Sequence, residues 1–366
     1  MAAGIIEAIG VISGVLGIIQ FGIDNFAEQE SVGSTVRITV GLDTSGGLNN
    51  AGGDLPDVRL FNEAGGFLGI TAGPGKVKSG GYGDITIDHK DDSTQQATYA
   101  LFSGNNDAIC IAFASITWPN GDKYSWVGDW GHQCGGSWYY SNVYVSGSND
   151  KPDCLWIDGN NDQPQSGFQV HWPEFVQKDG DTPLDQTDQA AKIERLCNAG
   201  PPFKMYNYAD TEDPKSITYW TINNKRSDDR VEGEDTAISY GPAKYPTSAR
   251  FRRGPSYYPR SNGTDFPNNS TTPSTNSPHS SRLVISNNAQ HTASGLCESE
   301  SSFGPDFFNP ADGTFCRMTD KTLWPVCDNS TAVDNCFHKD LQKLVVNGLA
   351  TRDTPYDNVL DWTSDN

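Results

Sequence analysis

Basic residues are scarce in this sequence, and none occurs before Arg37. The 366 residues include 26 Lys and Arg against 46 Asp and Glu, which gives a formal net charge of −20. Nucleic acids and anionic membrane surfaces repel such a chain, so we expect neither to be its partner. A secretory signal requires a basic segment before its apolar core, and the beginning of this sequence has none. We therefore expect either a signal outside this sequence or an unconventional route of export.

The common catalytic and metal-binding motifs are also missing. None of the six histidines lies in an H-E-x-x-H motif or beside a G-x-S-x-G turn, and no C-x-x-C pair is present. Asp158, Asn160 and Asp162 resemble the start of a calcium loop, but an EF-hand has Gly and Glu where Gln163 and Gln169 stand. We interpret this segment as a turn rich in Asp and Asn. We expect no catalytic residue and no cofactor.

Cysteine, by contrast, is present in an even number and is spread along the chain. This distribution indicates four disulfides rather than a zinc site. The eight cysteines are Cys110, Cys134, Cys154, Cys197, Cys297, Cys316, Cys327 and Cys336. Spacing does not determine the pairing, although a bridge between the last two would close a short loop. Disulfides are typical of secreted and cell-surface proteins, so we expect this chain to be one of them.

The longest apolar run covers residues 4–23, within an N-terminal segment of residues 1–33. On a helix, small residues would line one side and large aliphatic residues another, which allows helices to approach closely. The small side comprises Gly10, Gly14 and Gly17, and the large side comprises Ile5, Ile9, Ile12, Leu16 and Ile19. Each interior glycine costs about 1 kcal/mol relative to alanine, so this helix needs a packing partner. We expect it to pack on protein, in a homo-oligomer; membrane insertion and an uncleaved targeting segment are the alternatives.

Short alternating apolar segments, separated by Gly, Asn and Asp, predict a β domain over residues 34–176. The clearest signal is a hairpin around Asn120-Gly121, because this pair favours positive φ at a two-residue turn. About nine such strands are expected, and their spacing is typical of a β-sandwich. The predicted fold class is therefore mainly β, with the sandwich between an N-terminal Gly-rich helix and a C-terminal Cys-rich unit.

Aromatic residues are concentrated after this hairpin. We expect Trp126 and Trp138 to fill the core, because aromatic residues at strand spacing usually do. Trp130 lies in a loop between two glycines, which predicts an exposed side chain. Together with Asp129, Tyr139 and Tyr140, it makes up the candidate ligand-binding site, and a cell-wall component or a glycan is the candidate ligand.

Residues 177–260 form a mixed extension, with a helix over 185–198 and a strand over 217–222. Two basic pairs in it resemble sites for subtilisin-like processing enzymes. These pairs are Lys225–Arg226 and Arg252–Arg253.

Residues 261–281 are a predicted linker, in which 17 of 21 residues are Ser, Thr, Asn or Pro. Such a composition cannot bury enough apolar area to fold alone. Three of the four glycosylation sequons lie there, which supports an extracellular location. The acceptors are Asn262, Asn268, Asn269 and Asn329.

Residues 282–366 form a small Cys-rich unit. We expect one helix from Ser286 through Cys297 and a second from His338 to Leu349. Two helices of this length bury little core, so the disulfides should supply much of the stability.

Four stretches of the chain resemble an uncharacterised protein family of filamentous fungi. They are GDWGHQCGGSWYYSN, LPDVRLFNE and FQVHWPEF, within about residues 35–175, and CRMTDKTLWPVC nearer the C-terminus. The resemblance implies a fungal origin. The family has no known activity, so it implies no catalytic residue.

These observations predict a non-catalytic extracellular protein that self-associates through its N-terminal segment. A membrane-active, actinoporin-like toxin that inserts this segment is the first alternative. A lectin or a glycan-active enzyme that uses the aromatic loop is the second.

Overall fold

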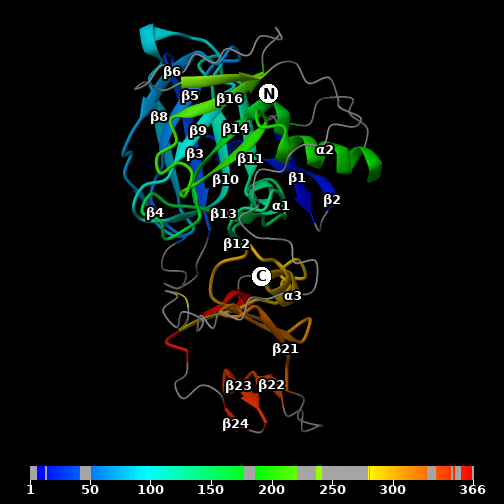
Figure 1. The fold of residues 1–366 in the computed structure, drawn as a ribbon. Coiled ribbons are helices and arrows are strands. Elements are labelled where there is room, and N and C mark those ends of the chain that lie inside the picture. Colours follow the sequence, from blue (N-terminus) through cyan, green and yellow to red (C-terminus); the bar gives the residue numbers. More distant parts are fainter. Residues whose placement is uncertain are drawn as a thin grey trace. The chain divides into compact units, whose positions relative to one another are not determined.

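The computed structural model describes residues 6–12, 15–41, 51–176, 186–220, 236–240, 279, 281–327, 335–347, 349–350 and 356–364. Strands dominate this part of the chain, so the predicted mainly β class is confirmed (Figure 1). The chain divides into two compact units, one of residues 1–42 and 49–252 and one of residues 43–48 and 253–366.

Several predicted sites lie outside the described residues and stay predictions. They are the acceptors Asn262, Asn268, Asn269 and Asn329, the basic pairs Lys225–Arg226 and Arg252–Arg253, and Gly14 of the N-terminal run.

The first sheet of the first unit contains the predicted central hairpin. Its strand order is β12-β13-β10-β3-β8, and β11 also pairs with β10. The strands are β3 (Ser34–Val40), β8 (Tyr82–Ile87), β10 (Ile109–Thr117), β11 (Lys123–Val127), β12 (Trp138–Tyr140) and β13 (Asp153–Ile157). β10 and β11 are antiparallel, and Gly121 in their turn has a φ of 87°, which glycine adopts without strain.

The second sheet has the strand order β15-β14-β9-β5-β6, and its neighbouring strands are antiparallel. The strands are β5 (Asp57–Phe61), β6 (Phe67–Thr71), β9 (Tyr99–Ser103), β14 (Gln165–His171) and β15 (Phe203–Asn207).

Aromatic side chains pack between the two sheets. Trp126 of β11 stacks on Phe168 of β14 and on Phe203 of β15, with 4.8 and 5.7 Å between ring centroids. Trp126 and Trp138 are 0% and 1% exposed, so their predicted place in the core is confirmed. This aromatic layer holds one sheet against the other.

Shorter elements surround these sheets. They are η1 (Ile23–Asn25), β4 (Gly53–Asp54), β7 (Lys76–Val77), η2 (Lys90–Asp92), α1 (Asp129–Gln133), η3 (Trp172–Phe175), α2 (Gln186–Asn198), β16 (Ser216–Trp220) and β17 (Thr236–Tyr240). The predicted helix over 185–198 is confirmed by α2. A short helix, α1, replaces the tight loop expected around Trp130.

The prediction of an N-terminal helix over residues 4–23 is wrong. Residues 6–21 contain two antiparallel strands, β1 (Ile6–Ile12) and β2 (Val15–Phe21), paired from Ile6 with Phe21 to Ile12 with Val15. Branched Ile and Val favour strands, and glycine weakens a helix, so local preference opposes the helix that the small-residue spacing suggested. Gly10 and Gly17 pair across the two strands.

All eight cysteines are paired, which confirms the prediction of four disulfides. The bridges are Cys110–Cys154, Cys134–Cys197, Cys297–Cys316 and Cys327–Cys336. In the first unit, one bridge joins β10 to β13, and the other joins the end of α1 to α2. Four bridges fit a secreted or extracellular protein.

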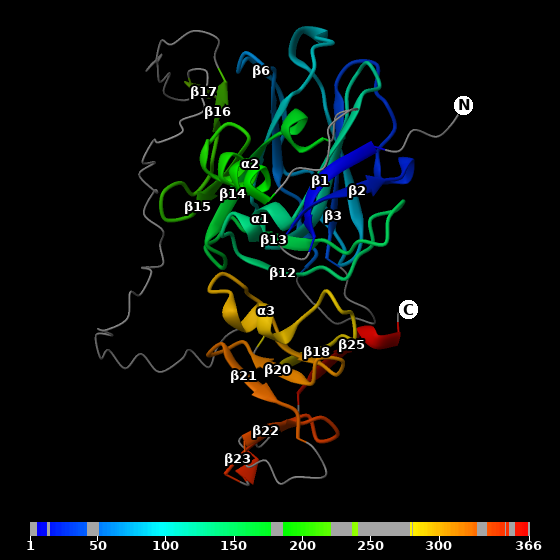
Figure 2. The same ribbon diagram turned by 90° about the vertical axis from the view of Figure 1, so that its right-hand side faces the viewer.

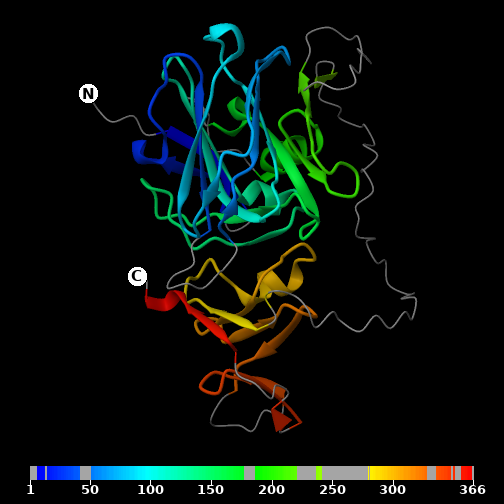
Figure 3. The ribbon, with the colours of Figure 1, turned by 90° about the vertical axis from the view of Figure 1, so that its left-hand side faces the viewer.

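The second unit, coloured yellow to red in Figure 3, is built mainly of strands. Its two sheets have the orders β21-β20-β19-β18-β25 and β22-β23-β24. The elements are β18 (Arg282–Ile285), α3 (Ala293–Glu298), β19 (Asp306–Asn309), β20 (Thr314–Arg317), β21 (Thr322–Pro325), β22 (Asn335–His338), β23 (Lys343–Val346), β24 (Leu349–Ala350), β25 (Asn358–Asp361) and η4 (Trp362–Ser364).

Both helices expected in this unit need correction. The first begins only at Ala293, because Oγ1 of Thr292 accepts the N–H of Gly295 at 3.0 Å, whereas Oγ of Ser286 lies 3.0 Å from Nδ1 of His291. The second prediction is wrong, since His338 ends β22, Lys343–Val346 form β23 and Leu349 begins β24. Gln342 and Asn347 adopt positive φ on either side of β23 and turn the chain there.

Candidate functional site

The aromatic loop does not form the exposed platform that its sequence suggests. Trp130 is 0% exposed, and its Nε1 donates to the carbonyl of Ile9 in β1 at 2.7 Å. Tyr139, Tyr140 and Asp129 are buried as well. The expectation of an exposed Trp130 is therefore wrong, because α1 directs the indole toward the N-terminal hairpin instead of solvent.

The Asp158 segment forms the expected turn. One carboxylate oxygen of Asp158 accepts the backbone N–H groups of Asn160, Asp162 and Gln163 at 3.2, 2.5 and 3.4 Å. This is an Asx turn, in which a side chain satisfies backbone donors. In the part of the chain that the structure describes, no group of three or more His, Cys, Asp or Glu is placed to hold a metal ion.

The hairpin of β1 and β2 is attached to the first unit through its inner face. Ile19 and Phe21 are 1% and 0% exposed, and the ring of Phe21 meets that of Phe113 edge-on at 5.5 Å. Ala8 of β1 forms a β-bridge with Val176, directly after η3. Figure 2 shows β1 and β2 beside α1. The same chain therefore covers one side of the hairpin.

The hairpin also presents an apolar surface to solvent. Val15, Ile18 and Ile23 are 52%, 45% and 45% exposed, and we call these three residues the hairpin patch. No charged residue occurs from Ala8 to Ile23, although a fifth of the whole chain is charged. Val15 and Ile18 are three residues apart in β2 and therefore project to opposite faces of the strand, and Ile23 lies in η1 directly after it. Exposed aliphatic residues in a stretch without charge are candidates for a surface of interaction. Among the helices that the structure describes, none is long and apolar enough to span a membrane.

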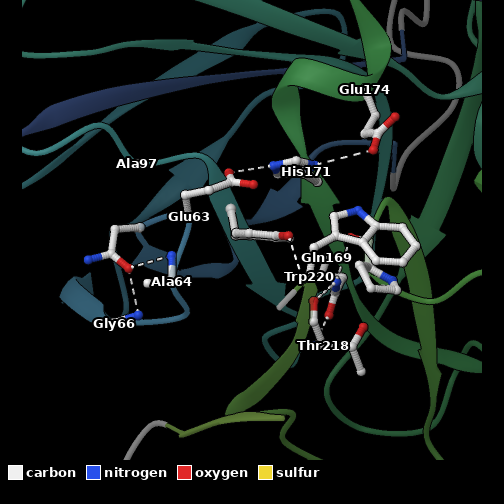
Figure 4. Close-up of polar contacts among 12 residues, drawn as sticks. Glu63, Ala64, Gly66, Ala97, Gln169, His171, Glu174, Thr218 and Trp220 are labelled. Carbon is white, nitrogen blue, oxygen red and sulfur yellow. Dashed lines mark hydrogen bonds and ion pairs between the residues drawn. The ribbon is translucent and has the colours of Figure 1, made fainter. Parts of the chain in front are cut away.

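His171, the last residue of β14, lies between two glutamates (Figure 4). Its Nε2 is 2.9 Å from Oε2 of Glu63, in the turn between β5 and β6, and its Nδ1 is 3.8 Å from Oε1 of Glu174 in η3. The imidazole stacks on the ring of Tyr99 in β9, with 4.1 Å between centroids. The side chain of His171 is 6% exposed, so this titratable group is inside the protein.

Arg195 of α2 completes the arrangement. Its two terminal nitrogens donate to the two carboxylate oxygens of Glu174 at 2.5 and 2.6 Å, a bidentate ion pair. We call Glu63, Tyr99, His171, Glu174 and Arg195 the His171 cluster. It joins the β5–β6 turn, β9, the end of β14 with the adjoining η3, and α2, which are distant from one another in the sequence.

Below the cluster, uncharged groups attach β16 to the second sheet. Nε2 of Gln169 donates to the carbonyl of Thr218 and its Oε1 accepts the N–H of Thr218, both at 2.8 Å. The N–H of Trp220 donates to the hydroxyl of Tyr99 at 3.1 Å. Figure 4 shows Trp220 beside the bonds between Gln169 and Thr218. The ring of Tyr99 is thus stacked on the imidazole of His171 and bonded through its hydroxyl to β16.

Opposing effects set the pKa values in the His171 cluster. Burial alone would lower the pKa of His171, but the carboxylates of Glu174 and Glu63 outweigh it, so the pKa is raised above 6.5. Burial would raise the pKa of Glu174, but His171 and Arg195 lower it to about 2. Burial would raise the pKa of Glu63 too, but the hydrogen bond and the charge of His171 stabilise its carboxylate and lower the pKa. His171 is therefore the group of the cluster whose charge changes at a pH above the ordinary histidine value of 6.5.

A second histidine, His132 of α1, stacks on Trp138 with 3.5 Å between ring centroids. Its Nδ1 lies 2.6 Å from Oδ2 of Asp153, whose N–H donates to Oδ1 of Asp129 at 3.2 Å. Burial, and next the charge of Asp153, raises the pKa of Asp129 well above 3.8. Cys134 nearby is bridged, so it supplies no thiolate to this histidine.

Sequence reasoning passes over most of the His171 cluster. The local signal is the spacing of three between His171 and Glu174 in the FQVHWPEF stretch. Glu63 precedes His171 by 108 residues, and Arg195 comes from a different helix. No periodicity connects such positions, so only the folded chain brings them together.

Comparison with known proteins gives no assignment. No family model matches the chain, and no curated protein matches it.

Proposed function

We propose that this chain is an extracellular, disulfide-stabilised protein that self-associates through its N-terminal hairpin. The observation that carries the proposal is the hairpin patch, two exposed aliphatic residues of β2 and one of the η1 turn that follows it, next to buried and anchored residues of the same hairpin. Two facing antiparallel sheets support a β-sandwich as the class of the first unit. A fungal origin, suggested by the sequence resemblance, belongs to the same proposal.

A second copy of the chain suits the hairpin patch better than a membrane does. Two copies of a chain with a net charge of −20 repel each other over most of their surfaces. The uncharged stretch from Ala8 to Ile23 is where they can approach without this cost. Stable attachment to an anionic bilayer needs basic residues beside the apolar ones, and none precedes Arg37.

The hairpin patch is the centre of the proposed interface and not its whole extent. A standard interface buries about 800 Å² per partner, which is more than three side chains provide. Polar neighbours such as Gln20, which is exposed, would form the rim. The anchored inner face keeps the patch ordered, so association loses little conformational entropy.

Light scattering of wild type and Ile18→Asp over a range of concentrations tests this function. Across a two-fold axis the new carboxylates would be desolvated close together, so we expect the variant to be monomeric where wild type assembles. Ile70→Asp is the matched control, because Ile70 is a strand residue 37% exposed on β6, and it should assemble like wild type.

Two results would contradict self-association. One is a monomeric wild type at all concentrations, and the other is normal assembly of Ile18→Asp. If wild type is monomeric and releases dye from uncharged lipid vesicles, the membrane-active alternative takes its place, since the same patch would then enter lipid. Polysaccharide pull-down addresses the glycan-binding alternative, for which the buried Trp130 offers no exposed contact.

A further inference from the structure

The hairpin is held by two elements that both meet at Glu174. The first is η3, which contains Glu174 and leads directly to Val176, the bridge partner of Ala8 in β1. Phe175 of the same element packs edge-on against Trp130 at 5.3 Å, and Trp130 in turn bonds the carbonyl of Ile9. A displacement of η3 would therefore disturb β1.

The second element is α2. Arg195 binds Glu174 through two hydrogen bonds, and Gln189, less than two turns earlier, accepts the N–H of Leu16 at its Oε1 at 3.2 Å. Leu16 lies in β2, so α2 contacts the strand that carries Val15 and Ile18. Glu174 is thus connected to both strands of the hairpin, to β1 through η3 and to β2 through α2.

His171 connects these elements to the rest of the second sheet. It faces Glu63 from the β5–β6 turn, Glu174 from η3 and the ring of Tyr99 from β9, while Arg195 of α2 lies on the far side of Glu174. Tyr219 of β16 is the further titratable neighbour of Tyr99. When His171 is charged, it pairs with the largely buried carboxylate of Glu174, which Arg195 also binds, and with the more exposed carboxylate of Glu63.

We propose that His171 is a pH switch that holds the N-terminal hairpin in its ordered position when protonated and loosens it when deprotonated. The proposal rests on the proposed function, because an ordered hairpin is the state that presents the hairpin patch to a second copy. The coupling passes from the imidazole to Glu174, and from there through η3 and α2 to the two strands.

The direction of the switch follows from the histidine. A histidine whose pKa is raised in the folded protein contributes stability that is fully present below pH 6.5 and is lost as the pH rises through the folded value. The hairpin should therefore be ordered in mildly acidic solution and loosened as the pH rises through the raised pKa of His171. The bidentate pair of Glu174 and Arg195 persists at both pH values, so α2 keeps its contact with η3.

Hydrogen–deuterium exchange of the hairpin amides tests the switch. Exchange of residues 6–21 is measured near pH 5.5 and near pH 8 and divided by exchange of β10 in the same sample, which removes the intrinsic effect of pH. In wild type we expect this ratio to rise about fivefold or more with pH, the usual size of coupling between two sites. In His171→Gln we expect a high ratio with little pH dependence.

His89→Gln is the matched control. His89 is another buried histidine of the first unit, bonded to Ser34 and Ser93, and its variant should keep the wild-type dependence. A wild-type ratio that does not change with pH would overturn the proposal, as would a His171→Gln variant with the wild-type dependence. If His171→Gln does not fold, Glu63→Gln replaces it, since Glu63 is 60% exposed. Losing one carboxylate should move the midpoint of the transition to lower pH, and an unchanged midpoint overturns the switch.

Failure of the switch can be separated from failure of the proposed function. The exchange measurement is made on dilute protein and does not require association. If the exchange ratio depends on His171 but light scattering finds no oligomer at either pH, the switch stands and self-association fails. If oligomers form while the ratio is independent of pH, only the switch fails. A lower pH also reduces the net negative charge and favours association, but His171→Gln shares that effect, so the comparison isolates the histidine.

Discussion

Trp130 is enclosed by Phe175 and by the backbone of β1, and its indole N–H is satisfied by Ile9. Asp129, the residue before it, is enclosed as well, although aspartate normally lies at the surface. Both side chains are inside because α1 folds this Gly-rich stretch onto β13 and the hairpin. At the residue scale, the sequence GDWG therefore carries structural groups, and their removal should affect stability first.

Trp130→Ala should lower the free energy of unfolding of the first unit by about 3–5 kcal/mol, as a large core deletion does. Trp126→Ala should have a comparable effect, because both side chains are 0% exposed. Urea unfolding followed by far-UV circular dichroism measures the two changes, and Ile70→Ala, 37% exposed, serves as the small-effect control. A Trp130→Ala variant that unfolds at the wild-type midpoint would show that the indole is dispensable for the fold.

Asp129→Asn should stabilise the protein more near pH 7 than near pH 3.5. A buried carboxyl group with a raised pKa favours folding when protonated, so its contribution declines as the pH rises above 3.8 and then stays low. Asparagine keeps an oxygen that can accept the N–H of Asp153 but carries no charge. Urea midpoints of both proteins at the two pH values give the difference. An equal change at both values would mean that Asp129 is not protonated more readily in the folded state.

At the scale of elements, the N-terminal hairpin shows how packing selects among local options. Its strands are apolar on both faces, and the body of the first unit buries both Ala8 and Ile9 of β1 but leaves Val15 and Ile18 of β2 exposed. Gly10 faces Ile19 so closely that a Cβ at position 10 would lie 2.6 Å from Cδ1 of Ile19 and 3.2 Å from Cγ2 of Val127. Glycine is therefore needed there by the close approach of buried side chains.

Gly10→Ala distinguishes the hairpin from the helix that the glycine spacing suggests. In a helix this substitution would stabilise the segment by about 1 kcal/mol. In the hairpin it should destabilise the first unit by roughly 1–3 kcal/mol, because Ile19 is 1% exposed and has little room to move. Thermal or urea unfolding decides between the two signs, and a gain in stability would contradict the hairpin.

The whole molecule has a large net negative charge, and four disulfides cross-link its chain. The bridge from Cys134 to Cys197 spans 63 residues, and it attaches α2, the helix that carries Arg195 and Gln189, to the end of α1. Closing a loop of this length lowers the conformational entropy of the unfolded chain and stabilises the folded protein by about 4 kcal/mol. Reduction should thus loosen the element on which the hairpin and the His171 cluster both depend.

Titration of the unfolded but unreduced protein should find no free thiol. The structure pairs all eight cysteines, and an oxidising compartment is where four such bridges form and persist. Mass spectrometry with and without a reductant identifies the pairs and checks Cys134–Cys197 in particular. Two or more free thiols in freshly purified protein would argue against the extracellular location.

Local patterns indicated much of the first unit correctly. The Asn120-Gly121 turn, the alternating strands on either side of it and the helix before Gly200 are set by neighbouring residues, so a short window contains the necessary information. Failure came where distant contacts compete with local preference. The run from Ile6 to Phe21 suits several structures by spacing alone, and residues around Leu344 have helical spacing although they form strands that turn at Gln342 and Asn347.

By itself, the sequence determined the mainly β class, the oxidised state of the cysteines and the acidic character of the protein, because composition and short-range periodicity express them directly. Only the tertiary structure decided that Trp130 is buried, that the N-terminal run forms a hairpin and that His171 lies between Glu63 and Glu174. Burial and charge pairing depend on which surfaces meet after folding, and those surfaces come from positions as far apart as 173 residues.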